Sequence, residues 1–159
     1  MELYLFRHGH AEDAPPGNPD SSRALTEKGV ERSAAVAKMA RDSGVEPSLI
    51  VSSPYLRAMQ TAEVAAREFG WKGEIVKFPS LVPHGTPEGV WSELREHRDE
   101  SAIILAGHEP LMAHLAAYLL NAPGLTIDVK KSAMIRIDLA ARGNVPRGVL
   151  RWMIVPKLV

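Results

Sequence analysis

Short apolar runs alternate along the chain with longer segments in which apolar residues recur at helical spacing. The runs at residues 2–6, 48–52, 74–78 and 101–106 have the length of buried strands. Capping residues, prolines and glycines mark the helices, which we expect from Glu27 (capped by Thr26) to Gly44, from Pro54 (capped by Ser53) to Gly70, from Pro87 to His97, and onward from Pro110. This alternation predicts crossover connections and an α/β fold with a mainly parallel sheet.

The last part of the chain has a different pattern. Residues 133–139 and 149–155 are two strand-like runs, and the turn-like segment Arg142–Gly148 separates them. We therefore expect a closing antiparallel hairpin at one edge of the sheet. The proline-rich loop from Asp13 to Ser22 has two open interpretations, a flexible flap over a site or an ordinary connection.

Composition narrows the class of protein. The 159 residues are most economically one domain, and 45% hydrophobic and 24% charged residues are ordinary values for a soluble globular chain. Lys+Arg and Asp+Glu both number 19, so no overall field favours nucleic acid or an anionic membrane as partner. The absence of cysteine excludes disulfides, thiolate catalysis and cysteine-ligated metals.

The location of the protein is also suggested by the hydrophobic pattern. Charged and polar residues from Glu2 onward interrupt any stretch resembling a signal peptide. No window approaches the roughly 20 apolar residues that a membrane span needs. We expect a cytoplasmic protein.

Three of the apolar runs end in residues suited to binding phosphate. Arg7-His8-Gly9 follows the first run, Ser52 to Arg57 follows the second, and Gly107-His108-Glu109-Pro110 follows the run at 101–106. The carboxyl ends of parallel strands share one edge of the sheet, where ligands bind. The sequence therefore predicts that two histidines and two arginines converge on one crevice: Arg7, His8, Arg57 and His108.

The placement of these residues favours an anion as ligand. Arg57 lies in the first turn of its predicted helix, where a cation is unfavourable by a few tenths of a kcal/mol unless an anion lies nearby. His108 lies beside the start of the fourth helix, where free amides attract anions. Arg7 is suited to a bidentate phosphate contact, and His8 adds a ring that titrates near neutral pH. Each residue alone could be an ordinary surface residue.

Other chemistries find little support. The six histidines include no pair at i, i+4 spacing, and Met112 stands where a zinc-protease motif needs its second histidine, so we expect no metal site. There is no phosphate-binding loop of nucleotide triphosphatases, no dinucleotide fingerprint and no serine nucleophile elbow. Basic and aromatic residues are not interleaved, so a nucleic-acid platform is not indicated.

Four motifs together resemble those of a known family. These motifs occur in the order and spacing typical of the histidine phosphatase superfamily, which includes the phosphoglycerate mutases. They are Arg7-His8-Gly9, the segment Arg23-Ala24-Leu25-Thr26-Glu27-Lys28-Gly29, the segment Ser52-Ser53-Pro54-Tyr55-Leu56-Arg57-Ala58-Met59-Gln60-Thr61, and Gly107-His108. The resemblance covers essentially the whole chain. In its short length, the chain is most similar to the bacterial phosphohistidine phosphatases of this superfamily.

The resemblance implies a three-layer α/β/α fold and a covalent mechanism. His8 would attack phosphorus, become phosphorylated and then be released by water. Arg7, Arg57 and His108 would stabilise the charge of the phosphoryl group, without a metal or other cofactor. Arg23 would be a further phosphate or substrate contact.

The chain departs from many relatives in its general acid. The segment in which they carry a Glu or Asp acid, here residues 81–88, offers only His84 and Glu88 as candidates, and either could be a loop residue. An imidazole leaving group needs less help from an acid than an alcohol does. We therefore predict phosphohistidine on a protein as substrate.

The alternatives are a small-molecule phosphomonoesterase and a non-catalytic phosphate-binding module. The expected partner is a phosphorylated protein, such as a histidine-containing phosphotransfer domain, or a small phosphorylated metabolite. We expect the protein itself to be a monomer.

Overall fold

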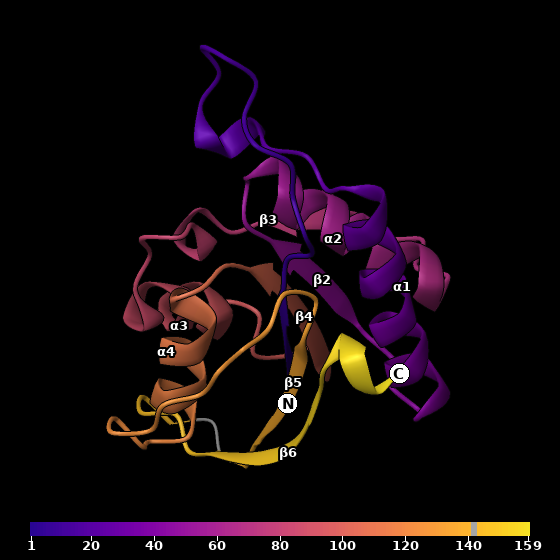
Figure 1. Cartoon of the computed structure of the whole chain (residues 1–159). Helices are drawn as coiled ribbons and strands as arrows, with labels where there is room; N and C mark the ends of the chain where they lie inside the picture. Colours follow the sequence, from indigo (N-terminus) through magenta and orange to yellow (C-terminus); the bar gives the residue numbers. More distant parts are fainter. Residues whose placement is uncertain (141–142) are drawn as a thin grey trace.

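The computed structural model describes residues 1–140 and 143–159, and within them six strands form one sheet in the order β3-β2-β4-β1-β5-β6. The strands are β1 (Glu2–Arg7), β2 (Leu49–Ser52), β3 (Ile75–Lys77), β4 (Ala102–Gly107), β5 (Met134–Leu139) and β6 (Gly148–Ile154). The helices are α1 (Glu27–Asp42), α2 (Leu56–Phe69), α3 (Pro87–Arg95) and α4 (Leu111–Leu119). Figure 1 shows their arrangement.

The sheet is mixed but mainly parallel, as predicted. Strands β1, β2, β3 and β4 pair in parallel, β5 lies antiparallel to β1, and β6 lies antiparallel to β5. The predicted hairpin at the sheet edge is therefore confirmed, although Arg142, at the start of its predicted turn, lies outside the described residues.

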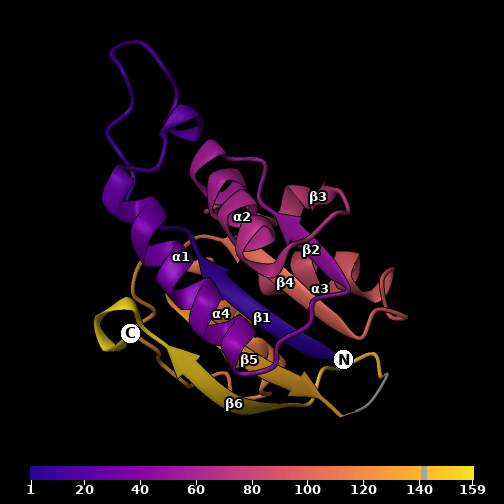
Figure 2. The same cartoon turned by 90° about the vertical axis from the view of Figure 1, so that its right-hand side faces the viewer.

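Helices cover both faces of the sheet, which gives the three expected layers (Figures 1 and 2). Successive residues of β1 point to opposite faces because side chains alternate along a strand. Leu3 and Leu5 join a core with residues of α3 and α4, whereas Tyr4 and Phe6 join a second core with residues of α1 and α2. All four are fully buried, and each such side chain stabilises the fold by about 1.5–3 kcal/mol.

Two helix starts show how local sequence acts. Thr26 caps α1 as predicted, because its side-chain oxygen accepts a hydrogen bond from the Gly29 amide at 3.0 Å. The prediction that α2 begins at Pro54 was wrong by two residues. Tyr55, with extended backbone, is the N-cap. Ser53 lies two residues earlier, where its hydroxyl accepts from the Tyr55 amide at 3.2 Å and contacts a histidine described below.

The remaining boundaries differ little from the prediction. Helix α3 ends at Arg95, two residues before His97, and α4 begins at Leu111 with Pro110 in its N-cap position. No helix in the described part of the chain combines the length and apolar character that a membrane crossing requires.

Candidate active site

The carboxyl ends of β1, β2 and β4 lie side by side, as the parallel register requires. Arg7 at the end of β1 is opposite Gly107 of β4, and Ser52 of β2 is opposite Ala106. The His8 amide donates to the Gly107 carbonyl at 2.9 Å, so both predicted histidine segments leave the sheet together. The structure thus brings the four predicted residues to one edge of the sheet.

The His8 ring has a defined orientation. Its Nδ1 lies 2.7 Å from the Gly9 carbonyl oxygen, and because a carbonyl only accepts, Nδ1 carries the hydrogen. The lone pair is therefore on Nε2, to which Arg57 Nε donates at 3.2 Å. The His8 and His108 ring centroids are 5.0 Å apart.

His108 is held by the segment that precedes α2. Its Nε2 lies 2.8 Å from the Ser53 hydroxyl, and its ring packs in a T-shaped arrangement with that of Tyr55, with 5.2 Å between the centroids. Its Nδ1 is buried and has no hydrogen-bond partner among the described residues. Since buried polar atoms normally have partners, this nitrogen is suited to a ligand.

Burial sets the charge of both histidines. It is the main cause that lowers the pKa of His8 to about 4, and the cations Arg57, Arg7 and Lys131 lower it further against the opposing Gly9 carbonyl. Burial is also the main cause that lowers the pKa of His108 to about 3, followed by electrostatic repulsion from Arg57 and, once it is protonated at low pH, from His8. Both rings are therefore neutral at pH 7. Lys131, which the sequence did not single out, lies within electrostatic reach of His8.

Arg7 is anchored by the segment before β5. Its Nη1 donates to the Val129 carbonyl at 2.7 Å, while its Nε is buried with no partner among the described residues. The backbone amides of Arg7 and Ser132 bind the carbonyls of Ala133 and His8, respectively. The guanidinium is fixed by one contact, and its remaining donors can bind an anion.

Asp20 from the long loop is the anion beside Arg57. Its carbonyl oxygen and its Oδ2 accept hydrogen bonds from Arg57 Nη1 and Nη2 at 3.0 and 3.1 Å. The unfavourable placement of a cation in the first turn of α2 had indicated that an anion lies nearby. The sequence could not show that the chain itself supplies one.

Arg23 contacts the loop rather than the histidines. Its Nη1 lies 3.3 Å from Asp20 Oδ1, and its Nε donates to the Glu12 carbonyl at 2.8 Å. Its link to the histidines runs through the shared contact with Asp20. Its predicted role as a phosphate contact stays a prediction.

The two predicted acids are exposed. His84 lies in the turn after Leu81, Glu88 lies in the first turn of α3, and no hydrogen bond in residues 1–140 and 143–159 joins either to the four converging residues.

Glu109, which sequence reasoning passed over, is half-buried beside His108. Burial raises its pKa, Arg7 lies within electrostatic reach, and its Oε1 accepts from the Ala113 amide at 2.8 Å.

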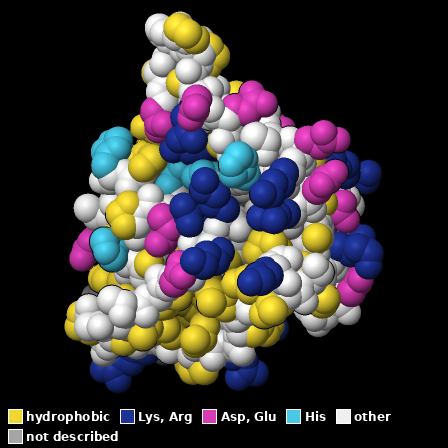
Figure 3. Space-filling model, viewed as in Figure 1, with side chains coloured by type: hydrophobic (Ala, Val, Ile, Leu, Met, Phe, Trp, Pro, Cys, Tyr) yellow, Lys and Arg dark blue, Asp and Glu magenta, His cyan; other side chains and the backbone are white. Residues whose placement is uncertain are grey.

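The surroundings of the site are cationic. Figure 3 shows histidine side chains in the middle of this face, below the projecting loop, with Lys and Arg side chains around them. Within the described ranges, no three acidic or histidine side chains are grouped so that they could hold a metal ion. The guanidinium groups of Arg7 and Arg57 both lie within electrostatic reach of the two histidines.

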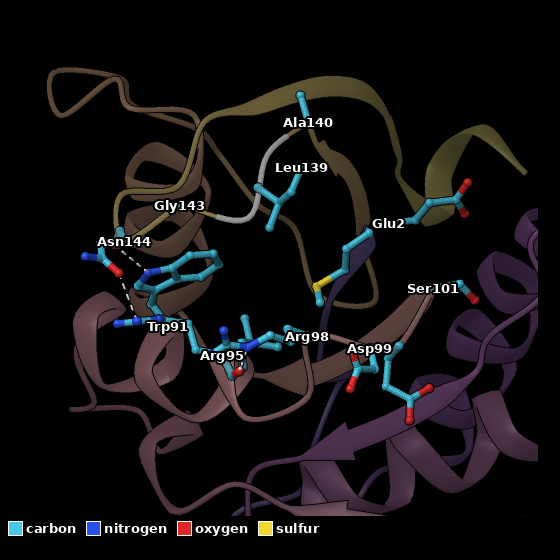
Figure 4. Close-up of a pocket in the computed structure, with 13 residues that line it drawn as sticks. Glu2, Trp91, Arg95, Arg98, Asp99, Ser101, Leu139, Ala140, Gly143 and Asn144 are labelled. Carbon is cyan, nitrogen blue, oxygen red and sulfur yellow. Dashed lines mark hydrogen bonds between the residues drawn. The ribbon is translucent and has the colours of Figure 1, made fainter.

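A cavity of about 530 Å³ lies at the opposite end of the sheet, where β1 and β4 begin (Figure 4). Trp91 and Arg95 of α3 both donate hydrogen bonds to Asn144 at its wall. None of the predicted site residues lines this cavity.

Comparison with known proteins agrees with this fold. The model of the histidine phosphatase superfamily (branch 1) matches residues 3–82. The chain belongs to this superfamily, and it is a phosphatase of that class.

Its similarity to individual proteins extends over nearly its whole length. It is 30% identical to phosphohistidine phosphatase SixA of Escherichia coli (strain K12), over 98% of this chain and 94% of that protein. A protein of Picosynechococcus sp. is 37% identical over 89% of this chain and 87% of its own. The structure of the protein histidine phosphatase SixA complexed with tungstate superposes with a TM-score of 0.89 at 28% identity, covering 99% of both chains. The alpha-ribazole phosphatase from Shigella flexneri shares the fold alone, with a TM-score of 0.76 at 17% identity, over 98% of this chain and 97% of its own.

Proposed function

We propose that this phosphatase hydrolyses phosphohistidine on a protein through a covalent intermediate on His8. One observation carries the proposal. The neutral His8 ring is locked by the Gly9 carbonyl so that the Nε2 lone pair lies beside Arg57. A buried, oriented imidazole of this kind is a nucleophile near pH 7.

In the first step, the lone pair of His8 Nε2 forms a bond to phosphorus. The bond from phosphorus to the leaving nitrogen breaks, and its electron pair goes to that nitrogen. Arg7 and Arg57 bind the phosphoryl oxygens. If the Ser53 hydroxyl donates to Nε2 of His108, the hydrogen of His108 lies on the unpartnered Nδ1, which donates to a third oxygen.

In the second step, water attacks the phosphorus of phosphorylated His8 and releases orthophosphate. The electron pair of the nitrogen–phosphorus bond returns to Nε2, so the starting tautomer is restored. The Gly9 carbonyl holds the Nδ1 hydrogen throughout and stabilises the positive charge that the ring carries while it is phosphorylated.

Two features support a phosphoramidate as substrate. His84 and Glu88 are exposed, so neither is positioned as an acid for an alkoxide leaving group. The relative of 30% identity from Escherichia coli is a phosphohistidine phosphatase. The protein partner would then present a phosphorylated histidine, as a histidine-containing phosphotransfer domain does.

Parallel assays on a protein phosphorylated on histidine and on sugar phosphates test the proposal. We expect a strong preference for the phosphohistidine protein and loss of hydrolysis in His8→Ala. If the protein were a phosphate-binding module, the same variant would change phosphate binding little. A strong preference for the esters would contradict the proposed substrate.

Glu109 favours a second candidate, a small-molecule phosphomonoesterase. A half-buried carboxyl with a raised pKa next to His108 is suited to donate a proton to an alkoxide. In that case Glu109→Gln would reduce the turnover of alkyl phosphates by about 10²-fold or more, whereas phosphohistidine hydrolysis would change little. Equal effects on both substrates would indicate that Glu109 only caps α4.

A further inference from the structure

Asp20 belongs to a loop that stands away from the body of the molecule and returns to the site. An isolated bridge between Ala11 and Leu25 and a hydrogen bond from the Glu12 amide to the Ala24 carbonyl at 2.8 Å close the base of the loop. Figures 1 and 2 show the loop projecting beside the start of α2. The short turn Asp20–Ser22 then brings Asp20 back onto Arg57.

The Asp20 carboxylate is ionised and still has free acceptor sites. Its desolvation alone would raise the pKa of Asp20, but the Arg57 charge and the hydrogen bonds from Arg23 and Arg57 outweigh it, so the pKa is lowered. Each carboxylate oxygen binds one guanidinium, whereas a carboxylate offers about four lone-pair sites. The side chain is 57% exposed, so the remaining sites are accessible to a substrate.

Asp20 lies on the side of Arg57 away from the nucleophile. Arg57 Nε faces His8 Nε2 at 3.2 Å, whereas the Nη atoms, at the other end of the same planar group, face Asp20. Asp20 also lies within electrostatic reach of His108. In phosphoryl transfer, the attacking and leaving atoms are roughly in line on opposite sides of phosphorus. Because His8 is buried whereas the Asp20 side chain is 57% exposed, the carboxylate lies toward the solvent, the side from which a substrate enters and its leaving group departs.

We propose that Asp20 selects leaving groups that carry a proton, and specifically a phosphorylated imidazole protonated on its second nitrogen. The inference rests on the proposed function and deepens it. The N–H of that second nitrogen donates to the free acceptor sites of the carboxylate. An opposite charge within about 4–6 Å favours the charged form of a titratable group, so the bound imidazole keeps its proton.

The proton balance of the first step then needs no general acid. The substrate ring enters as a cation with its hydrogen on the second nitrogen. When the nitrogen–phosphorus bond breaks, its electron pair stays on the leaving nitrogen, and the ring departs as neutral imidazole with the same hydrogen. An aryl or alkyl phosphate gains negative charge on its leaving oxygen instead, which the nearby carboxylate repels. Asp20 thus distinguishes phosphoramidates from esters.

The test compares Asp20→Asn with the unchanged enzyme on two substrates, a protein phosphorylated on histidine and p-nitrophenyl phosphate. We expect kcat/KM for the phosphohistidine protein to fall about tenfold or more at pH 8, since an opposite charge shifts a pKa by about 1–3 units. Activity on p-nitrophenyl phosphate falls much less than activity on the phosphohistidine protein, or rises, since the carboxylate repels the leaving oxygen of the ester. Asp20→Glu partly restores the preference, and the exposed Asp13→Asn in the same loop serves as the matched control.

The pH profile separates this role from a purely structural one. In Asp20→Asn, kcat for phosphohistidine begins to decrease at a pH about one unit lower on the alkaline side of its pH profile. The pH profile for p-nitrophenyl phosphate does not move in this way. If Asp20→Asn lowers kcat/KM equally on both substrates and the pH profile does not move, Asp20 only orients Arg57. If the variant raises kcat/KM equally on both substrates, Asp20 only competes with phosphate for Arg57. Either result overturns the inference and leaves the proposed function intact. An unchanged enzyme that prefers esters overturns the proposed function itself.

Discussion

The His8 and His108 rings are buried among cations, and their neutrality at pH 7 follows from that environment. Charging either ring would place a cation in an apolar region that already holds Arg57. The same burial that prepares His8 as a nucleophile therefore makes the folded state sensitive to acid.

We predict that stability falls as the pH is lowered from 6.5 toward 4. The unfolded chain binds protons on both rings at about pH 6.5, whereas the folded chain does so only near pH 4 for His8 and pH 3 for His108. Because the unfolded state binds more protons in this window, the free energy of unfolding decreases with falling pH. Urea unfolding at pH 7, 6 and 5 measures the effect.

A double variant, His8→Gln with His108→Gln, provides the comparison. Its stability is expected to depend less on pH than that of the unchanged chain, whereas His84→Gln at an exposed position retains the full dependence. Equal pH dependence in the double variant would contradict the assigned neutrality.

The role of Arg57 also depends on its surroundings. We expect Arg57→Ala to reduce kcat on the order of 10²–10³-fold, as removal of one charge-stabilising donor does in other enzymes. Arg67→Ala, an exposed arginine of the same helix, is the control and retains its activity. A near-normal rate in Arg57→Ala would mean that this guanidinium does not bind the transferred phosphoryl group.

At the scale of elements, the close approach of α1 to the end of β1 positions His8. A Cβ on Gly29 would lie 2.2 Å from the His10 carbonyl oxygen, and one on Gly9 would lie 2.7 Å from the Gly29 carbonyl oxygen. The buried hydroxyls of Ser33 and Ser132 meet beside them at 2.9 Å. Gly29, the glycine of the motif at the start of α1, is therefore required by packing.

Gly29→Ala is expected to destabilise the protein by about 2–3 kcal/mol, at the upper end of the cost of overpacking, because the obstructing atom belongs to the backbone. It should also lower kcat, since α1 must move away from the segment that follows His8. Chemical denaturation and a phosphatase assay measure the two effects. Gly124→Ala, where an added Cβ meets no atom within 4 Å, should be neutral in both. Equal stability of the two variants would refute the packing argument.

At the scale of the whole molecule, the site joins segments that are distant in the sequence. Arg7 and Arg57 donate to the carbonyls of residues that lie 122 and 37 positions away, respectively. His108 contacts the side-chain hydroxyl of Ser53, 55 positions away. A ligand that binds these segments together stabilises the complete fold, because the unfolded chain cannot bind it.

We therefore expect tungstate, a tetrahedral dianion, to raise the melting temperature. At about 100 times its Kd, the gain is about 2.7 kcal/mol, which corresponds to about 5–10 °C for a chain of this size. Thermal unfolding with and without tungstate measures the shift. Arg57→Ala should show a much smaller shift at the same concentration, and an equal shift in both proteins would place the anion elsewhere.

The elements and the four converging residues could be predicted from the sequence because they depend on local order. Hydrophobic periodicity and capping residues indicated the strands and helices. The rule that parallel strands end at one edge was enough to bring Arg7, His8, Arg57 and His108 together. The start of α2 was missed by two residues: the Ser53 hydroxyl accepts from the Tyr55 amide just before the helix, and it also contacts His108, 55 residues away.

The sequence by itself determined which chemical groups the site contains, since the motifs and the positions of the strands follow directly from the order of the residues. Only the tertiary structure decided their state: the neutral rings, the Arg57 contact with Asp20, the exposure of His84 and Glu88, and the half-buried Glu109. Burial and charge–charge distance exist only once segments far apart in the chain have packed. They shift a pKa or pair an ion without leaving any local pattern in the sequence.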